Sequence, residues 1–314
     1  MATAMKMKRA GSLLLGILIL LQVSSPEIFS RSAQEAEVAD FIYDHGCVFL
    51  RLRVNEVDGL LFLLDTGASA SAIDLKVAEK LRLPLTGTQS VEGTAGVIAA
   101  KQARIESLSL GNARAKNLSV PAYDLSGALA PPGSRLDGIL GYDFLRFFSV
   151  RLDFAKRAIT LSAQKAGPAA SETRADGLPF TVDNGVPRFA AVLNSSVKAE
   201  FRLDTGASLF ATRDVYLNIT EGVWEKLIAA EPGLKPERYF TGSGVGGEIR
   251  LPVARIKNLS VGAIHVATPL VIVQPRQGYF ARAEAAGFLS NNFLEKFSPV
   301  TISYLENKIY LSRQ

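Results

Sequence analysis

The sequence contains one unit twice, in the same order, and this repeat constrains the fold more than any other feature. The pentapeptide Asp-Thr-Gly-Ala-Ser begins at Asp65 and again at Asp204, an offset of 204 − 65 = 139. Three later pairs of segments match at offsets of 151, 149 and 150: residues 103–111 with 254–262, 138–145 with 287–294, and 157–161 with 307–311. Four collinear matches indicate two related units. The rise in offset predicts an insertion early in the second unit, for which residues 221–236 are the candidate.

Length and composition agree with two units of moderate size. A chain of 314 residues with 48% hydrophobic residues can bury one large core or two modest ones, and typical domain sizes favour two. We expect an N-terminal unit over residues 38–161 and a C-terminal unit over residues 178–314. Residues 162–177 are small and polar, without apolar periodicity, and are predicted to form a linker.

The first residues of the chain indicate export. Lys6, Lys8 and Arg9 precede an apolar run over residues 11–23, and a turn-prone Ser-Ser-Pro follows that run. This pattern is typical of a signal peptide, so residues 1–33 are predicted to be an export segment and the protein to be periplasmic or secreted. The apolar run is shorter than the roughly 20 residues that span a bilayer, which favours a cleaved signal over an N-terminal membrane anchor, although the anchor stays open.

The scarcity of cysteine and histidine limits the chemistry that the chain can perform. Cys47 is the only cysteine, so no intramolecular disulfide can form, and the alternation within residues 47–54 predicts a strand in which Cys47 is a small buried side chain. With only His45 and His265, we expect neither a His-rich zinc site nor a His-based nucleophile triad. No metal and no cofactor is therefore predicted. Lys and Arg do not cluster as in nucleic-acid binders, so no nucleic-acid partner is expected.

Each unit is predicted to be mainly β. Short runs rich in Leu and β-branched residues are divided by Gly, Pro and Asn, which predicts strands with few helices. Helical apolar spacing over residues 73–81, just before Pro84, predicts one short helix in the first unit. In the second unit, the spacing over residues 223–228 predicts a longer helix in which Trp224 is a packing anchor.

Each copy of the pentapeptide follows a Phe-x-Leu segment that is predicted to be a strand, Phe62-Leu63-Leu64 or Phe201-Arg202-Leu203, which places a carboxylate at the end of a strand. Gly67 and Gly206 let the backbone turn tightly and approach another segment closely. One such motif is a weak signal, since Asp and Gly are frequent in turns, but a turn would not require the same five residues twice. If the units pack about a pseudo-two-fold axis, Asp65 and Asp204 meet at it. Two adjacent carboxylates cannot both ionise cheaply, so one holds a proton while the other is charged.

Such a carboxylate pair can hydrolyse an amide. The charged carboxylate acts as general base toward a water held between the two, and the protonated one donates to the substrate carbonyl and later supplies a proton to the leaving amine. This chemistry requires neither a metal nor a covalent intermediate.

Residues 64–69 and 203–208 resemble the motif of the retropepsin-like aspartic proteases, in particular their exported, two-lobed bacterial members. The resemblance covers about residues 40–314 and includes the family's apolar-apolar-Gly element at Ile139-Leu140-Gly141. It implies two acid-protease β-barrel lobes with few short helices, and an aspartic endopeptidase in which Asp65 and Asp204 are catalytic. It also implies that two loops support the pair, with the threonines hydrogen-bonded across the axis: Thr66, Gly67, Ala68, Thr205, Gly206 and Ala207.

The same family closes Gly-rich hairpin flaps over bound peptide. The candidates lie in residues 91–97 and 241–247, and a plain mobile turn is the alternative for each. Their glycines are Gly93, Gly96, Gly244, Gly246 and Gly247. The sequence departs from the family at Ser290, where the pattern has glycine, so we expect the packing beneath Asp204 to differ from that beneath Asp65.

Three functional hypotheses stay open at this point. The leading one is an endopeptidase that acts on polypeptides as a monomer, because a short linker gives the two units a high effective concentration for an intramolecular pseudo-dimer. The second is a peptide-binding module that has lost turnover, which Ser290 and the insertion motivate. The third is a protease assembled from two chains, as a homodimer.

Overall fold

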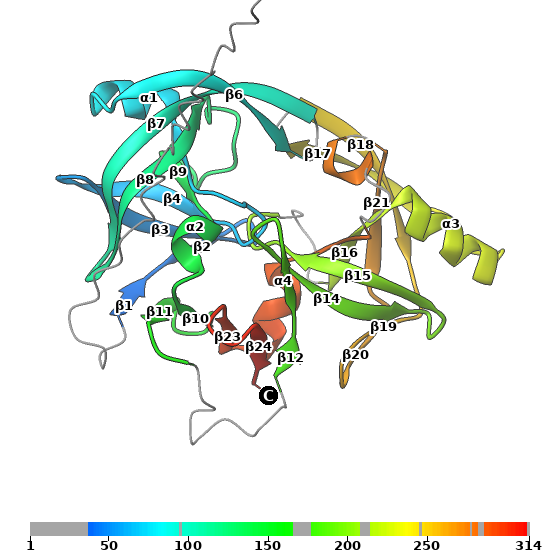
Figure 1. Cartoon of the computed structure of the whole chain (residues 1–314). Coiled ribbons are helices and arrows are strands. Elements are labelled where there is room, and N and C mark those ends of the chain that lie inside the picture. Colours follow the sequence, from blue (N-terminus) through cyan, green and yellow to red (C-terminus); the bar gives the residue numbers. More distant parts are fainter. Residues whose placement is uncertain are drawn as a thin grey trace, which may run out of the picture.

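The computed structural model of the protein describes residues 37–93, 96–165, 177–207, 214–244, 247–276, 278–281 and 286–312. Strands dominate these residues and form three sheets, so the predicted mainly β class is confirmed (Figure 1). The predicted export segment, residues 1–33, lies outside the described residues, and so do residues 166–176 of the predicted linker. No helix in the described ranges is long and apolar enough to cross a membrane.

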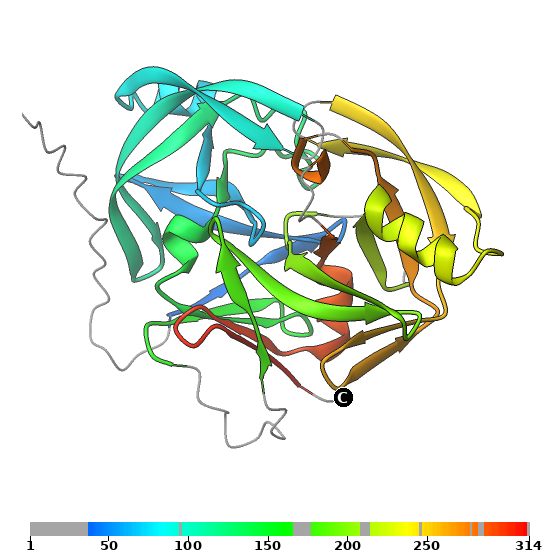
Figure 2. The same cartoon turned by 45° about the vertical axis from the view of Figure 1, so that its right-hand side comes forward.

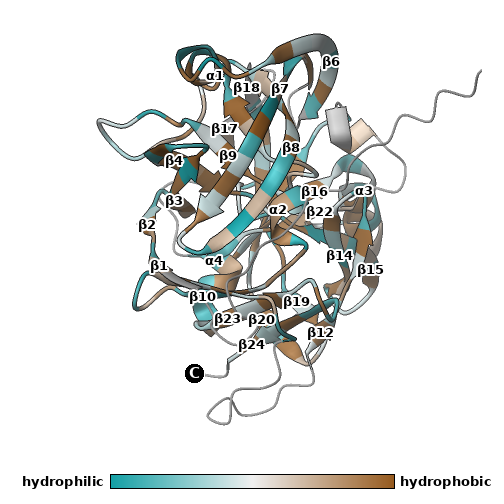
Figure 3. Ribbon diagram, turned by 60° about the vertical axis from the view of Figure 1, so that its left-hand side comes forward, coloured by the Kyte–Doolittle hydropathy of each residue, from teal (hydrophilic) through white to brown (hydrophobic). Residues whose placement is uncertain are grey.

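The first sheet is built from the N-terminal half of the chain. Its eight strands pair in the order β2-β3-β4-β9-β5-β8-β7-β6, and an additional pairing of β3 with β7 closes a ring of strands. Buried side chains alternate with more exposed ones along β8, and the colours of its ribbon alternate accordingly (Figure 3). The strands are β2 (Ile42–Asp44), β3 (Cys47–Val54), β4 (Val57–Leu64), β5 (Ala72–Asp74), β6 (Leu85–Gly93), β7 (Gly96–Leu110), β8 (Ala113–Tyr123) and β9 (Gly138–Leu140).

The second sheet repeats this arrangement in the C-terminal half. Its strands pair in the order β17-β18-β21-β16-β22-β15-β14-β19-β20, and β13 pairs with β14. The order from β17 to β14 matches that from β6 to β3, with β18 in the place of β7 and β21 in that of β8. The strands are β13 (Thr181–Asp183), β14 (Val186–Leu193), β15 (Val197–Leu203), β16 (Tyr216–Thr220), β17 (Arg238–Gly244), β18 (Gly247–Arg255), β19 (Asn258–Val261), β20 (Ile264–Ala267), β21 (Leu270–Gln274) and β22 (Gly287–Leu289).

The third sheet contains strands from both halves of the chain, which the sequence does not predict. We call it the shared sheet, and its order is β1-β11-β10-β23-β24-β12. The halves meet where β10 pairs with β23, and there the hydroxyls of Ser149 and Ser303 lie 3.0 Å apart. Its strands are β1 (Glu37–Asp40), β10 (Ser149–Asp153), β11 (Ala158–Ser162), β12 (Leu178–Pro179), β23 (Val300–Ser303) and β24 (Lys308–Leu311).

Both predicted helices are present. α1 (Leu75–Lys80) begins after Asp74, whose carboxylate accepts hydrogen bonds from the first-turn N–H groups, whereas Ile73 belongs to β5. α3 (Glu221–Ala230) begins after Thr220, whose hydroxyl caps it in the same way, and Trp224 packs against the core as predicted. The remaining helices are short: α2 (Tyr142–Leu145), α4 (Asn291–Leu294) and the 3₁₀ turns η1 (Gly278–Ala281) and η2 (Glu295–Phe297).

The extra residues of the second unit are divided between two places. Ile73 pairs with Gly138 in the first sheet, and Ile219 pairs with Gly287 in the second, so the offset between these matched positions is 219 − 73 = 146. The offset therefore rises by 146 − 139 = 7 before Ile219 and by only 151 − 146 = 5 between Ile219 and residue 254, a stretch that includes α3. The prediction that residues 221–236 carry the insertion was thus only partly right, because the matches in sequence measure the total change and not where it occurs.

The largest apolar cluster is continuous through both halves of the chain. It contains Phe62 of the first sheet, Phe201 of the second and Ile302 of the shared sheet, and each of these side chains is fully buried. Because the hydrophobic contribution to stability scales with buried apolar area, this common core holds the two Gly-containing loops after β4 and β15 in a fixed relation.

Candidate active site

Two strands of matching position deliver the two aspartates to one place. β4 ends at Leu64 and β15 ends at Leu203, and each pairs in parallel with the short strand that precedes α2 or α4. The N–H of Asp65 donates to the carbonyl of Leu140 at 3.0 Å, and the N–H of Asp204 donates to that of Leu289 at 2.9 Å. The apolar side chains at the ends of β4 and β15 are buried, so both aspartates stand at the ends of rigid elements.

The two loops interlock through their threonines. The N–H of Thr66 donates to Oγ1 of Thr205 at 3.0 Å, and the N–H of Thr205 donates to Oγ1 of Thr66 at 3.1 Å. Each hydroxyl then donates to the main-chain carbonyl before the opposite aspartate, Thr66 to Leu203 and Thr205 to Leu64, both at 2.8 Å. Both threonines are buried, so these four hydrogen bonds replace contacts with water completely.

The glycine that follows each threonine makes room for the aspartate of the other loop. A Cβ atom on Gly67 would lie 2.7 Å from Cγ of Asp204, and one on Gly206 would lie 2.5 Å from Cγ of Asp65. Neither glycine has a positive φ, so the need for glycine at these positions is the close approach of a carboxyl group. Sequence reasoning assigned these residues to the loops that support the pair, and the structure brings them together.

The carboxyl groups of Asp65 and Asp204 are hydrogen-bonded to each other. Each also accepts main-chain N–H donors of its own loop: Gly67 donates to Asp65 Oδ1 at 2.8 Å, and Ala207 donates to Asp204 Oδ1 at 2.9 Å. Both side chains remain partly exposed to solvent. The two carboxyl groups are thus held side by side at the surface, and the main-chain hydrogen bonds fix their orientation.

The electrostatics of the two carboxyl groups differ. Burial raises the pKa of Asp65, although its hydrogen bonds from the Gly67 and Ala68 N–H groups oppose this change. The pKa of Asp204 is raised well above its ordinary value by burial and, next, by the negative charge of Asp65. Burial and the charge of Asp65 therefore both favour the protonated form of Asp204.

Comparison with known proteins finds a family match in the first half of the chain. Residues 50–144, which include β4, the loop of Asp65 and β9, match the family model described as aspartyl protease. A retropepsin-like aspartic protease from Rickettsia conorii is a similar solved structure, with 24% sequence identity, coverage of 44% of this chain and 92% of that one, and a TM-score of 0.30. No curated protein matches the chain.

Ser290 has the same backbone geometry in the second half as Gly141 has in the first half. Gly141 (φ −113°, ψ −167°) precedes α2, and Ser290 (φ −124°, ψ −174°) precedes α4. A Cβ on Gly141 would lie 2.6 Å from the Ala70 carbonyl, whereas the side chain of Ser290 is accommodated in a buried position. The packing at the two positions therefore differs. Residues 208–213, which begin with the last residue of the second motif, lie outside the described residues.

The Gly-rich segments form the tips of two hairpins. Gly93 pairs with Gly96 at the end of β6 and β7, and Gly244 pairs with Gly247 at the end of β17 and β18, while Gly246 lies outside the described residues. β6 and β7 also contact η1 of the second half, so the first hairpin reaches across to the other side of the molecule (Figure 2).

Sequence reasoning did not identify two tyrosines that lie near the aspartate pair. The pKa of Tyr123, at the end of β8, is raised to about 12 by burial and by the charge of Asp65. The pKa of Tyr304, which follows β23 in the shared sheet, is also raised by burial, with a further contribution from Asp65. Neither residue belongs to a recognisable motif, and only the pairing of distant strands brings them to the site.

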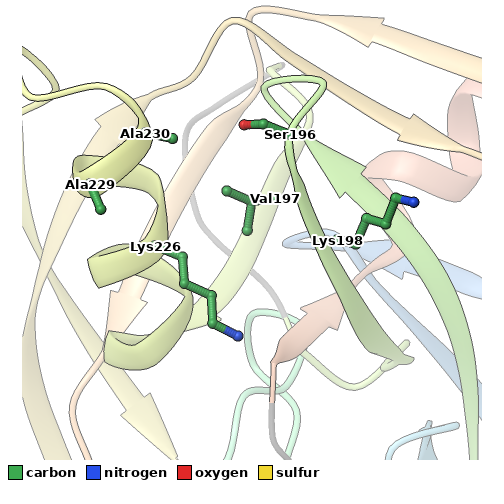
Figure 4. Close-up of a pocket in the computed structure, with 6 residues that line it drawn as sticks. All are labelled: Ser196, Val197, Lys198, Lys226, Ala229 and Ala230. Atoms are coloured by element: carbon green, nitrogen blue, oxygen red, sulfur yellow. The ribbon is translucent and has the colours of Figure 1, made fainter.

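A surface hollow of about 470 Å³ lies away from the aspartate pair, between α3 and the turn that joins β14 to β15 (Figure 4). Its lining contains no carboxylate, so it offers no group for acid–base hydrolysis. It is lined by Ser196, Val197, Lys198, Lys226, Ala229 and Ala230. Within the described ranges, no three His, Cys, Asp or Glu side chains gather as a metal site would require.

Removing one threonine hydroxyl should destabilise the folded protein. In Thr66→Val or Thr205→Val, one N–H and one carbonyl lose buried partners, and we expect the free energy of unfolding to fall by about 2 kcal/mol. Urea denaturation with an unchanged slope measures this change. Thr86→Val, at an exposed position of β6, is the matched control and should change stability by less than about 0.5 kcal/mol. Equal stabilities for all three variants would contradict the role of the threonine pair.

Proposed function

We propose that the protein is an aspartic endopeptidase in which Asp65 and Asp204 of one chain activate the attacking water. The observation that carries this proposal is the hydrogen bond between two partly exposed carboxyl groups, held by interlocked loops. A turn-stabilising aspartate would satisfy its oxygens within its own loop. These two carboxyl groups instead face each other, an arrangement in which one proton can be shared, as acid–base hydrolysis needs.

In the proposed mechanism the two groups have different roles. Asp65, as the charged member, accepts a proton from the water while that water attacks the peptide carbonyl. Asp204, as the protonated member, donates a hydrogen bond to the carbonyl oxygen and stabilises the negative charge that develops there. The proton taken by the pair then passes to the leaving amine, and the bond breaks without a covalent intermediate.

The proposed substrate is an extended polypeptide that lies between the aspartate pair and the two hairpins. Val97 supports this position because its side chain is 62% exposed beside the tip of the first hairpin, where an apolar side chain has no partner of its own. Apolar, partly buried residues of the same half, including Ala68, Val91 and Ile98, offer a surface for substrate side chains. We also propose that the hairpins act as flaps and that the protein works outside the cytoplasm as a monomer.

A protease assay tests the proposal directly. The purified protein is incubated with denatured casein between pH 3 and pH 8, with and without pepstatin, which mimics the tetrahedral intermediate of this reaction. Internal cleavage that pepstatin inhibits is the expected result. Binding of peptide without cleavage at any pH would instead support the alternative of a binding module, which the changed packing at Ser290 favours.

The pH range of the activity should depend on the alanine that follows each glycine of the motif. Ala68 and Ala207 lack a hydroxyl that could donate to an ionised aspartate, and burial raises the pKa of both carboxyl groups. In the double variant Ala68→Ser/Ala207→Ser, an added donor would stabilise the charged form, so its pKa falls. We expect the acid limb of the kcat/KM profile to move to lower pH by about one unit. An unchanged acid limb would contradict this explanation.

A further inference from the structure

Resting on the proposed function, we infer that Asn291 and Cys47 are positioning residues of Asp204. Each donates a hydrogen bond to the carbonyl of a peptide unit whose N–H group supports the Asp204 carboxylate. Neither residue belongs to the repeated motif, and neither touches a carboxyl group itself.

The side chain of Asn291 holds the first of these peptide units. Asn291 is the first residue of α4 and is fully buried. Its Nδ2 donates to the carbonyl oxygen of Thr205 at 2.7 Å and to that of Gly46 at 3.0 Å, so both amide hydrogens are used. The carbonyl of Thr205 and the N–H of Gly206 belong to one peptide unit, and that N–H is hydrogen-bonded to Asp204. Asn291 thereby fixes the orientation of a donor to the carboxylate.

The thiol of Cys47 holds the next peptide unit of the same loop. Cys47 is fully buried, and its Sγ donates to the carbonyl oxygen of Gly206 at 3.6 Å. The N–H of that peptide unit belongs to Ala207 and donates to Asp204 Oδ1 at 2.9 Å. Two consecutive N–H groups thus face Asp204, and the carbonyl of each peptide unit receives a side-chain donor from outside the loop.

The side-chain hydrogen bonds to the two carbonyl groups strengthen the hydrogen bonds that the N–H groups of the same peptide units donate. A hydrogen bond to a carbonyl oxygen polarises the amide and strengthens the hydrogen bond that its N–H donates, by about 10–30% per bond. Stronger N–H donors stabilise the charged form of a carboxyl group and lower its pKa. Asn291 and Cys47 therefore oppose the effect of burial on Asp204, and they also keep its carboxyl group in place.

The first half of the chain lacks this arrangement. The turn at residues 44–47 has its counterpart at residues 183–186, at the same offset of 139 as the motif, and Val186 stands there in the place of Cys47. Tyr142 stands in the place of Asn291, with its ring edge-on to Tyr304 at 5.7 Å. A valine side chain has no hydrogen-bond donor, so Val186 cannot reproduce the contact that the thiol of Cys47 makes with Gly206. The support is specific to Asp204 and makes the two aspartates unequal.

Other ionisable groups lie on the elements that pack against this loop. Asp65 faces Asp204 directly, and Asp44 and His45 form an ion pair at 3.0 Å in the turn that carries Gly46. Tyr43 donates to Glu295 at 2.7 Å below the same turn. Every profile is also measured in a His45→Asn background, which removes that ionisable group from the interpretation.

The experiment compares Cys47→Val, Cys47→Ser and Asn291→Leu with the wild type by pH profiles of kcat and KM. Valine is the residue of the first half and cannot donate, whereas serine retains a donor. We expect the alkaline limb, which reports loss of the proton on Asp204, to lie about 0.3 pH units higher in Cys47→Val than in Cys47→Ser. In Asn291→Leu we expect the alkaline limb to lie at higher pH than in the wild type. We also expect a kcat about ten-fold lower and a KM within about two-fold of the wild type.

Tyr142→Phe is the matched control, because it alters the counterpart of Asn291 in the first half and should leave the alkaline limb unchanged. If Asn291→Leu does not fold, the two Cys47 variants decide the question. Superimposable alkaline limbs for Cys47→Val and Cys47→Ser, in an active wild-type background, would overturn this inference and leave the proposed function intact. A wild type without any peptidase activity would instead overturn the proposed function itself.

Discussion

Asp65→Asn and Asp204→Asn should each abolish peptide cleavage, with kcat reduced by about 10³-fold or more. The amide is nearly isosteric with the carboxyl group, but it can neither accept the proton of the water at position 65 nor supply one at position 204. Because burial makes ionisation of both groups unfavourable, the loss of the charge should not destabilise the fold. Initial rates on a fluorogenic peptide, together with urea denaturation, measure the two effects separately.

The control for these variants is Asp58→Asn, in which an aspartate with 74% of its side chain exposed is replaced far from the loops. It should retain wild-type activity. The pattern of any residual activity is informative. If Asp204→Asn remained fully active and only Asp65→Asn were inactive, the active pair would be formed by two copies of Asp65 from two chains, and the single-chain mechanism would be wrong.

Gly67→Ala and Gly206→Ala should each lower kcat by about 100-fold while the protein remains folded. The added methyl group would lie 2.7 Å or less from the Cγ atom of the opposite aspartate, which is too close for contact. The carboxyl group must therefore move, and the hydrogen bond between Asp65 and Asp204 is lost. The same kinetic assay measures the effect, and a crystal structure of either variant would show the displaced side chain.

Gly233→Ala is the appropriate control for the glycine variants. A Cβ at Gly233 meets no atom within 4 Å, and its φ is not positive, so this substitution should leave activity and folding unaffected. Equal activities for Gly206→Ala and Gly233→Ala would show that the close approach of the two loops is not needed for the reaction.

The sequence predicted the main class of structure and the residues that meet at its centre. Two copies of a five-residue motif, each after a Phe-x-Leu segment, are local signals, and repetition removes the ambiguity that one copy has. The two predicted helices were found for a similar reason, since their apolar spacing is local and Asp74 and Thr220 cap them. The catalytic roles of Asp65 and Asp204 remain predictions.

Other features could not be predicted, because they depend on contacts between residues far apart in the sequence. The shared sheet joins β10 to β23 across about half of the chain, and nothing in either strand indicates its partner. Cys47 was correctly expected to be buried, but its contact with Gly206 spans 159 residues. The position of the insertion was predicted only in part, because the offset between matching segments gives the total number of extra residues, whereas the pairing of strands shows where they lie.

Because both halves lie in one chain, the surroundings of the two aspartates can evolve separately. In a symmetric homodimer every residue near the axis appears twice, so a substitution must suit both copies of its environment at once. Here Gly141 and Ser290 occupy matching backbone positions with different side chains, as do Tyr142 and Asn291. Each half can therefore acquire mutations independently, and a pair of chemically identical acids can be given separate surroundings by ordinary point substitutions.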